Sequence, residues 1–331
     1  MVKASIIIPT YKRPQETADC LKFLSNSLGF GQEFLLEVII VDSSPDKKTF
    51  SEIKKYQEIF ELKYLHLRKK TLPGQARNIG IKIAKNELII MLDSDIEIMP
   101  VTIGRMINYL KNHPTVSRLT GKTIFSSGEN KGQIDRPTKW DRQVMIDRTN
   151  YIEGIYGRYE AFYKTPFLSI GGYDKIFDVC GEGTDLSIRF WRAGFPLAID
   201  ENIIAYHNTE APESLRRTVI NKMTAMYRSL FIVAYKYGVK ELESSPNFVK
   251  SHQEREAAYG ETIEFHSIVS AAESIEWFKK NYSDLVKSKK AVPKLFDFKP
   301  FDVFSDQKLF AQCINQALEI NAKSYKKVFT N

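Results

Sequence analysis

The sequence predicts an α/β protein in which a mostly parallel sheet is flanked by helices, with a helical region after it. Two patterns indicate this architecture. Over about the first 100 residues, short runs rich in Ile, Val and Leu alternate with segments whose apolar side chains recur at helical spacing. From about residue 215 onward, amphipathic helical patterns follow one another. Strands that alternate with helices favour right-handed crossovers and a doubly wound, parallel sheet.

The first part of the chain contains the clearest strand and helix patterns. Strands are predicted at residues 4–8, 35–41, 62–67 and 87–92, and helices at 14–28, 47–60 and 74–85. The run at 4–8 is short, apolar and rich in β-branched residues, which is typical of a parallel strand buried on both faces. Farther along, the pattern predicts a strand pair within 150–164, a helix at 185–193 and a strand at 197–207. Residues 128–137 are predicted to form an exposed loop.

Composition and charge narrow the class of protein. The chain has 43% hydrophobic and 27% charged residues, enough for an ordinary globular core. Its three cysteines, Cys20, Cys180 and Cys313, fit no zinc or disulfide pattern, so we expect a reducing compartment, the cytoplasm. The sequence shows neither a signal-peptide core nor a long apolar run typical of a membrane span. The net charge of +8 comes without a dense basic tract interleaved with aromatics, so nucleic acid is not an expected partner.

Polar residues follow three of the predicted strands at the point where each strand ends. Thr10 comes after the first, Asp42 after the second, and Asp93-Ser94-Asp95 after the fourth. Ligands of doubly wound sheets bind outside the carboxyl ends of the strands, so we expect these side chains to line one crevice. Two carboxylates two residues apart can hold a divalent cation that bridges a diphosphate. The tripeptide alone also fits a solvated turn.

Four segments in this order resemble the motifs of family 2 glycosyltransferases, which have the GT-A fold. They are SIIIPTYKR at residues 5–13, VIIVDSS at 38–44, PGQARNIG at 73–80 and MLDSD at 91–95. The later segments GGYD at 171–174 and GEGTDLSIR at 181–189 also fit the family. The resemblance implies a GT-A catalytic domain at residues 1–214, with a nucleotide-binding half (1–100) and an acceptor half (101–214), followed by a helical region at 215–331.

The resemblance also implies which residues form the nucleotide pocket. It assigns to the nucleotide sugar Pro9, Thr10, Tyr11, Arg13, Asp42, Arg77, Asp93, Ser94 and Asp95. Tyr11 would lie beside the base, and Asp42 would accept a hydrogen bond from it, as a carboxylate does from uracil, which favours a UDP-sugar donor. Arg77 would lie near the phosphates. Alternatively, Arg13 is a solvated residue at a helix start and Asp42 caps a turn.

A metal site is implied at the same place. Asp95 would ligate Mn²⁺ or Mg²⁺, and Asp93 would face the ribose or sugar as the second acid of the pair. His207, at the end of the last predicted strand, would complete the coordination, since imidazole suits manganese-type ions better than magnesium. A lone histidine is also commonly structural.

The sequence departs from the family pattern at the catalytic base. The family presents Glu-Asp before a helix and uses the Asp, whereas this chain has Glu182-Gly183-Thr184-Asp185. An inverting transferase needs a base that takes the proton of the acceptor hydroxyl. Three hypotheses follow: Glu182 is the base, Asp185 is the base, or the protein is weakly active or inactive. Asp185 could instead stabilise the helix start.

Four further residues are candidates for the sugar and acceptor side. Glu153 and Gly154 lie in a segment that resembles the family's strand over the donor sugar. Trp140 and Tyr173 are candidate stacking platforms for a sugar ring, although aromatic residues more commonly belong to a core. The loop at 128–137 is a candidate lid over the donor.

The predicted helix at residues 215–237 is amphipathic and basic. Its charge comes from Arg216, Arg217, Lys222, Arg228 and Lys236. One interpretation is a helix docked on the catalytic domain, and the other is a peripheral contact with the inner face of a membrane, where many relatives build lipid-linked glycans. Two further helices are predicted at 263–287 and 305–327, and the C-terminal helices are a candidate interface for a homo-oligomer.

Together these features predict an inverting, metal-dependent glycosyltransferase of the hexosyltransferase type. It would move a sugar from a nucleoside diphosphate, UDP in particular, to a hydroxyl of a glycan or lipid-linked acceptor. The alternative, prompted by Gly183, is a non-catalytic or weakly active nucleotide-sugar-binding protein in a glycan assembly complex. A nucleotidyltransferase is disfavoured because residues 9–14 lack a glycine-rich phosphate loop.

Overall fold

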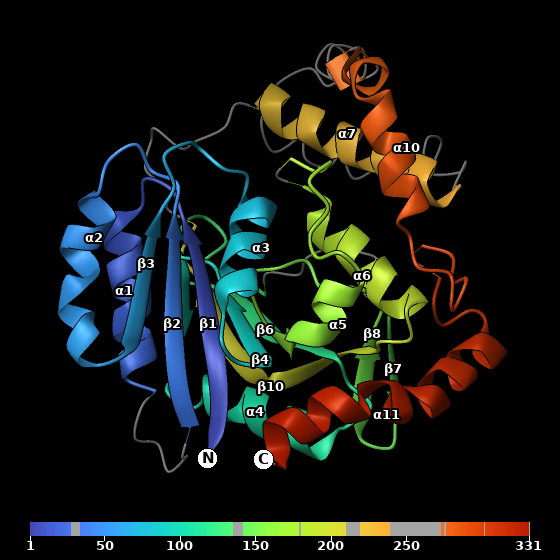
Figure 1. The fold of residues 1–331 in the computed structure, drawn as a ribbon, viewed down its shortest axis with the longest axis horizontal. Helices are drawn as coiled ribbons and strands as arrows, with labels where there is room; N and C mark the ends of the chain where they lie inside the picture. The colour runs from blue at the N-terminus through green and yellow to red at the C-terminus, as the bar shows by residue number, and fades with distance from the viewer. Residues whose placement is uncertain are drawn as a thin grey trace.

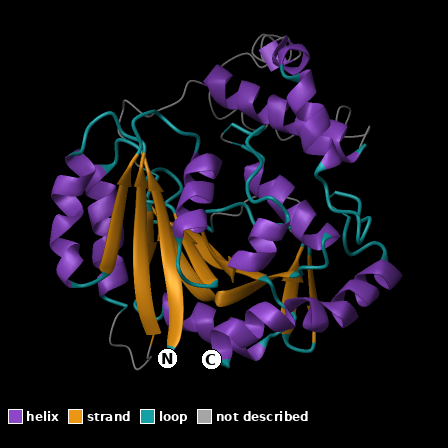
Figure 2. Ribbon diagram, in the orientation of Figure 1, coloured by secondary structure: helices purple, strands orange, loops and turns teal. Residues whose placement is uncertain are grey.

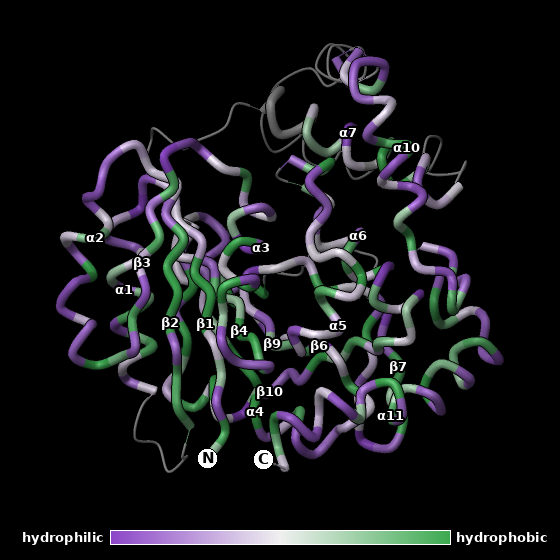
Figure 3. The backbone as a smooth tube through the Cα atoms, in the orientation of Figure 1, coloured by the Kyte–Doolittle hydropathy of each residue, from purple (hydrophilic) through white to green (hydrophobic). Residues whose placement is uncertain are grey.

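The first half of the central sheet is parallel, as the sequence predicts. In the computed structural model, the described residues are 1–27, 34–134, 142–178, 180–209, 219–238, 273–274, 276–300 and 302–330. Strands β1 (Val2–Thr10), β2 (Phe34–Asp42), β3 (Glu61–His66) and β4 (Leu88–Leu92) lie in the order β3-β2-β1-β4, all parallel. Strands β1, β2 and β4 form an apolar core (Figure 3) because most of their side chains are buried on both faces, whereas the side chains of β3 are partly buried or exposed.

Helices cover both faces of this parallel half (Figures 1 and 2). Helices α1 (Pro14–Ser25) and α2 (Lys48–Ile53) lie on one face, and α3 (Pro73–Ile83) lies on the other. The single helix predicted at 47–60 is in fact α2 followed by a 3₁₀ helix, η1 (Lys54–Glu58). Gly80 allows α3 to approach the sheet closely, since a Cβ there would lie 2.5 Å from Cγ2 of Ile7 and 3.0 Å from Cγ2 of Val41.

The second half of the sheet is mixed. Its elements are β5 (Ile96–Ile98), α4 (Thr102–Asn112), β6 (Arg118–Phe125), β7 (Gln143–Ile146), β8 (Thr149–Ile152), β9 (Tyr159–Tyr163), α5 (Lys164–Ser169), α6 (Glu182–Arg192) and β10 (Leu197–His207). β9 is antiparallel to both of its neighbours, β4 and β6. Both strands predicted within 150–164 are present, but they do not pair with each other: β8 pairs with β7 and β10 instead of with β9. The fold class predicted from the sequence is confirmed by the sheet as a whole.

The C-terminal region packs in two places. Helices α7 (Val219–Tyr237) and α10 (Tyr282–Lys290) contact each other and share a small apolar core with the start of α6. Helix α11 (Gln307–Phe329) returns across the catalytic half, where Asn321 is fully buried and accepts a hydrogen bond from Ser117 (2.8 Å). Residues 263–272 and 275 of the predicted helix at 263–287 lie outside the described residues, and its last part overlaps α10. A domain boundary at 214/215 stays a prediction, since residues 210–218 are not described.

Part of the basic face predicted for α7 faces the protein. Lys236 is fully buried, and Arg228 lies over the ring of Trp277 at 4.8 Å. Arg216 and Arg217 lie outside the described residues. No helix in the described ranges is both long and apolar enough to cross a bilayer. A membrane-surface contact and a homo-oligomer stay predictions.

Asn321 provides a test of how α11 is attached. Its amide also donates to the carbonyl of Thr115 (2.8 Å), so Asn321→Leu would leave Thr115 and Ser117 with unmatched polar groups in the interior. We expect a loss of about 2–4 kcal/mol in the free energy of unfolding, measured by chemical denaturation. Lys323→Leu, an exposed change two residues away on the same helix, is the matched control. Equal effects of the two changes would contradict this account of α11.

Candidate active site

The polar residues that follow the parallel strands lie at one edge of the sheet. Thr10 and Asp42 are direct partners in the register of β1 and β2, and β4 lies on the other side of β1. Asp93 follows β4 immediately. This edge is the carboxyl end of the parallel strands, where α/β sheets bind ligands.

Arg77 joins the acid pair to the start of α6. Its Nη2 lies 2.6 Å from Oδ1 of Asp93, and its Nη1 lies 3.2 Å from Oε1 of Glu182. The guanidinium is only 7% exposed and packs over the ring of Tyr173 at 5.4 Å. Burial would lower the pKa of Arg77, but Asp93, Tyr173 and Glu182 raise it well above its ordinary value. The guanidinium therefore stays charged and fixes the positions of both carboxylates.

Asp95 has different partners from Asp93. It forms an ion pair with Arg13, and its Oδ2 lies 3.7 Å from Nε2 of His207. Burial would raise the pKa of Asp95, but His207 and Arg13 together lower it to about 2. This carboxylate is thus ionised over the ordinary pH range and carries its charge next to an imidazole.

The three predicted metal ligands do not form one group. Asp95 and His207 face each other, whereas Asp93 is bound by Arg77. Within the part of the chain that the structure describes, no group of three or more His, Cys, Asp or Glu side chains could hold a metal ion. The donor set at this place is one carboxylate and one imidazole, a pair that suits manganese-type ions when a ligand supplies further oxygens.

The predicted nucleotide residues differ in exposure. Asp42 is fully buried, and its carboxylate accepts hydrogen bonds from the hydroxyl of Tyr64 (2.7 Å) and the amide of Ser44 (2.8 Å). Recognition of a nucleobase by Asp42 therefore stays a prediction. Tyr11 is partly exposed, with the ammonium groups of Lys12 and Lys70 at 5.6 and 5.0 Å from its ring.

Other members of this predicted pocket are less open. The hydroxyls of Thr10 and Thr17 share a hydrogen bond of 2.8 Å, so Thr10 fastens the end of β1 to α1. Ser94, between the two acids, is buried, and Pro9 is partly buried. Of the predicted set, Tyr11, Arg13, Asp93 and Asp95 are partly exposed, with 22% of the Arg13 side chain and 25% of the Asp93 side chain accessible to solvent.

The two candidate bases on α6 have opposite environments. The side chain of Glu182 is 13% exposed at the first turn, where Arg77 holds it. Asp185 is fully buried. Its carboxylate is bound by Arg189 (Nη2 to Oδ2, 2.7 Å), Lys236 (Nζ to Oδ1, 2.5 Å) and the hydroxyl of Tyr237 (2.8 Å). Part of the Glu182 side chain is accessible to solvent, whereas Asp185 fixes α7 to α6.

Gly183 has a steric reason to be glycine. A Cβ at this position would lie 2.8 Å from Cα of Tyr156 and 3.1 Å from the carbonyl oxygen of Ile155. Both are backbone atoms, so they cannot move aside as a flexible side chain would. The first turn of α6 therefore packs directly on the backbone of residues 155–156, and an acid at position 183 does not fit.

A buried polar network connects the first turns of α6 to the sheet. Arg118 and Glu160 are both fully buried and form an ion pair (2.5 Å). Arg118 also donates to the hydroxyl of Ser187 on α6 (2.9 Å), and the hydroxyl of Tyr173 donates to Glu160 (2.7 Å). Burial, followed by the charge of Glu160, raises the pKa of Tyr173 well above its ordinary value. Tyr173 is 2% exposed, so in this structure it supports Arg77 and offers no open face to a sugar.

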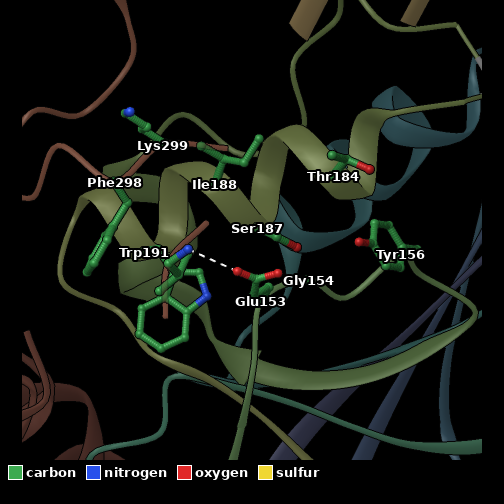
Figure 4. A pocket seen from close by; sticks show the side chains of 10 residues that line it. Glu153, Gly154, Tyr156, Thr184, Ser187, Ile188, Trp191, Phe298 and Lys299 are labelled. Atoms are coloured by element: carbon green, nitrogen blue, oxygen red, sulfur yellow. Dashed lines mark hydrogen bonds between the residues drawn. The ribbon is translucent and has the colours of Figure 1, made fainter. Parts of the chain in front are cut away.

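Glu153 and Gly154 line a small cavity that is partly open to solvent (Figure 4). The cavity lies between α6 and the loop that carries these residues, with Trp191 and Phe298 among its apolar walls. Glu153 is bound by Arg142 (3.0 Å) and by the amide of Val303 (2.9 Å). Burial raises its pKa despite Arg142. Trp140 lies outside the described residues.

Comparison with known proteins identifies the family. The model of glycosyl transferase family 2 matches residues 5–171, just over half of the 331 residues. The chain belongs to this family. The match includes the acid pair and Arg77 and ends before α6. The resemblance seen in the sequence is thereby confirmed.

Similar members of family 2 include bacterial polymer-modifying enzymes. The chain is 30% identical over 114 residues to the poly(ribitol-phosphate) beta-N-acetylglucosaminyltransferase TarS of Staphylococcus aureus, a match that covers 34% of this chain and 20% of TarS. It is 23% identical to the related enzyme TarP over 328 residues, covering 90% of this chain and 94% of TarP. The crystal structure of S. aureus TarS 1-349 in complex with UDP-GlcNAc has a TM-score of 0.59 at 17% identity and covers 98% of this chain and 90% of that chain.

Sequence patterns did not indicate several residues of the site. Four charged residues near the acids or the start of α6 belong to no motif: Arg118, Glu160, Lys236 and Arg158. Arg118 and Glu160 lie in strands whose pairing was not predicted, and Lys236 comes from α7, far along the chain. A charged residue within an otherwise apolar strand, such as Glu160, was the one available signal.

The buried position of Asp185 can be tested by its effect on stability. Asp185→Asn would leave Arg189 and Lys236 with less compensating charge in the interior, so we expect a loss of about 3 kcal/mol in the free energy of unfolding. Asp284→Asn is the matched control, because Asp284 pairs with Lys287 at the surface and its side chain is 42% exposed. Thermal and chemical denaturation would measure both. A fully stable Asp185→Asn protein would contradict the structural role.

Proposed function

We propose that this chain transfers a sugar, with inversion, from a nucleoside-diphosphate donor to a hydroxyl of a glycan or glycolipid acceptor. The observation that carries the proposal is the position of Glu182. This partly exposed carboxylate is held by the same guanidinium that holds Asp93. Inverting transfer requires a base that takes the proton of the acceptor hydroxyl. Glu182 lies on the opposite side of Arg77 from the acid pair, where it could serve as this base.

The donor is proposed to be a UDP-sugar. Support comes from TarS, whose crystal structure contains UDP-GlcNAc and has the same fold. Tyr11 and Arg13, which follow the carboxyl end of β1, are the residues proposed to contact the nucleotide. The names of the relatives make an N-acetylglucosamine or glucose unit the first donor to test, and poly(ribitol phosphate) the first acceptor.

Glu182 is the proposed base. As the acceptor oxygen forms its bond to the anomeric carbon, the bond from that carbon to the phosphate oxygen breaks, and Glu182 takes the hydroxyl proton. Arg77 orients Glu182 through its Nη1. Asp185 is disfavoured because its carboxylate is buried and bound by two cations. The binding-only alternative loses its main support, because the close backbone at Tyr156 explains Gly183.

Asp95 and His207 are the residues proposed to hold Mn²⁺ or Mg²⁺. Their carboxylate oxygen and imidazole nitrogen lie 3.7 Å apart, and a donor diphosphate would supply further oxygen ligands. A bound cation would neutralise charge on the leaving diphosphate. Asp93 is proposed to orient Arg77, with which it forms an ion pair, and to face the donor sugar. It is not proposed as a metal ligand.

Replacing the proposed base should separate binding from chemistry. We expect Glu182→Gln to lower kcat by about 10²- to 10⁴-fold and to leave the Kd of UDP within about twofold, because the amide cannot accept the proton. Steady-state kinetics with UDP-GlcNAc and calorimetry with UDP would measure both quantities. Glu201→Gln, at an exposed position on β10, should change neither. Undiminished turnover of Glu182→Gln would rule out this base.

Metal dependence can be measured without turnover. UDP with Mn²⁺ should raise the melting temperature more than either alone, since a ligand at about 100 times its Kd adds about 2.7 kcal/mol of stability. His207→Ala should abolish the part of this shift that depends on Mn²⁺ and keep the part due to UDP alone. A metal-dependent shift that survives both His207→Ala and Asp95→Asn would place the metal elsewhere.

A further inference from the structure

Arg158 lies beside the acid pair and has been given no role so far. It is the last residue before β9, and its carbonyl oxygen accepts a hydrogen bond of 2.7 Å from the amide of Asp93. This bond fixes the backbone of Arg158 to the first residue of the acid pair. The position of its side chain is therefore set relative to the crevice.

The backbone at Arg158 is unusual. Its φ angle is +75°, and Gly157 before it has a φ of +97°. A non-glycine residue in the left-handed region costs about 1 kcal/mol, and such strain is concentrated at functional sites. Glycine would fit this place without strain, yet the chain has arginine here.

The guanidinium of Arg158 lies among the charged groups of the site. Its Nη1 contacts Nδ1 of His207, whose other nitrogen faces Asp95. Burial lowers the pKa of Arg158, and the charges of Asp93 and Asp95 oppose this effect. Arg158 is partly buried, so its guanidinium is less hydrated than one at the surface, while part of the residue stays accessible to solvent.

We propose that Arg158 binds the diphosphate of the donor and stabilises it as the leaving group. The inference rests on the proposed function, because it requires a nucleoside-diphosphate ligand. An arginine fork matches phosphate oxygens in a bidentate manner and is weakly hydrated. When the bond between the anomeric carbon and the phosphate oxygen breaks, the electron pair remains on that oxygen, and the guanidinium faces the added negative charge.

The test is a comparison of UDP with uridine. We choose Arg158→Asn because asparagine tolerates the left-handed backbone while it removes the cation. The Kd of UDP should rise about tenfold or more, with Mn²⁺ and also with a chelator, and that of uridine should stay within about twofold. Arg158→Lys, which keeps the charge but loses the fork, should give an intermediate Kd for UDP.

Arg148→Asn is the matched control. Arg148 also has a positive φ, +64°, but it is exposed on the turn between β7 and β8, so the change alters net charge and backbone strain equally. It should leave both constants unchanged. An Arg158→Asn protein that keeps the wild-type ratio of the UDP and uridine constants, even at a lower melting temperature, would show a purely structural role and overturn the inference. Failure of the wild type to bind UDP would overturn the proposed function itself.

Discussion

The guanidinium of Arg77 is the constraint on which the candidate site depends. Buried in the crevice, it must be neutralised, because an unpaired charge in the interior is strongly unfavourable. The two carboxylates that neutralise it come from different parts of the fold: Asp93 follows β4, and Glu182 begins α6. Their positions are consequently coupled, so that the end of β4 and the start of α6 are held in one geometry.

A series of buried polar side chains connects Arg77 to the sheet. The ring of Tyr173 lies beneath Arg77, and its hydroxyl binds Glu160, which pairs with Arg118. Arg118 then reaches Ser187 on α6. Each of these side chains contacts the next through a cation–π contact, a hydrogen bond or an ion pair. Buried polar groups that are paired in this way stabilise a single arrangement. The first turn of α6 is thus supported by the sheet as well as by Arg77.

The sequence was informative where local pattern determines structure. Short runs that alternate with helical patterns predicted the four parallel strands, and the topology of such sheets placed Thr10, Asp42 and Asp93 at one edge. The pairing of β8 and β9 was mispredicted, because an apolar run shows that a strand is buried without naming its partner.

The sequence also did not show which side chains are buried by segments far along the chain. Glu182 and Asp185 look equivalent in the sequence, and the difference between them comes from α7, some fifty residues farther along, which supplies Lys236. The glycine at 183 looked like a missing acid because its neighbour, the backbone of Tyr156, is also remote in sequence. Tyr64, which covers Asp42, lies on the next strand and was not recognised for the same reason.

The attachment of α7 has a consequence for exchanging parts between relatives. Lys236 of α7 bridges Asp174, which precedes α6, and Asp185, which lies in the first turn of α6. A chimaera that joins residues 1–214 to the helical region of another transferase would leave the buried carboxylate of Asp185 and the partly buried carboxylate of Asp174 without this ammonium group unless the new helix supplied a cation at the equivalent place. The two regions are therefore not interchangeable modules: a compatible pair must carry matching charges across the junction.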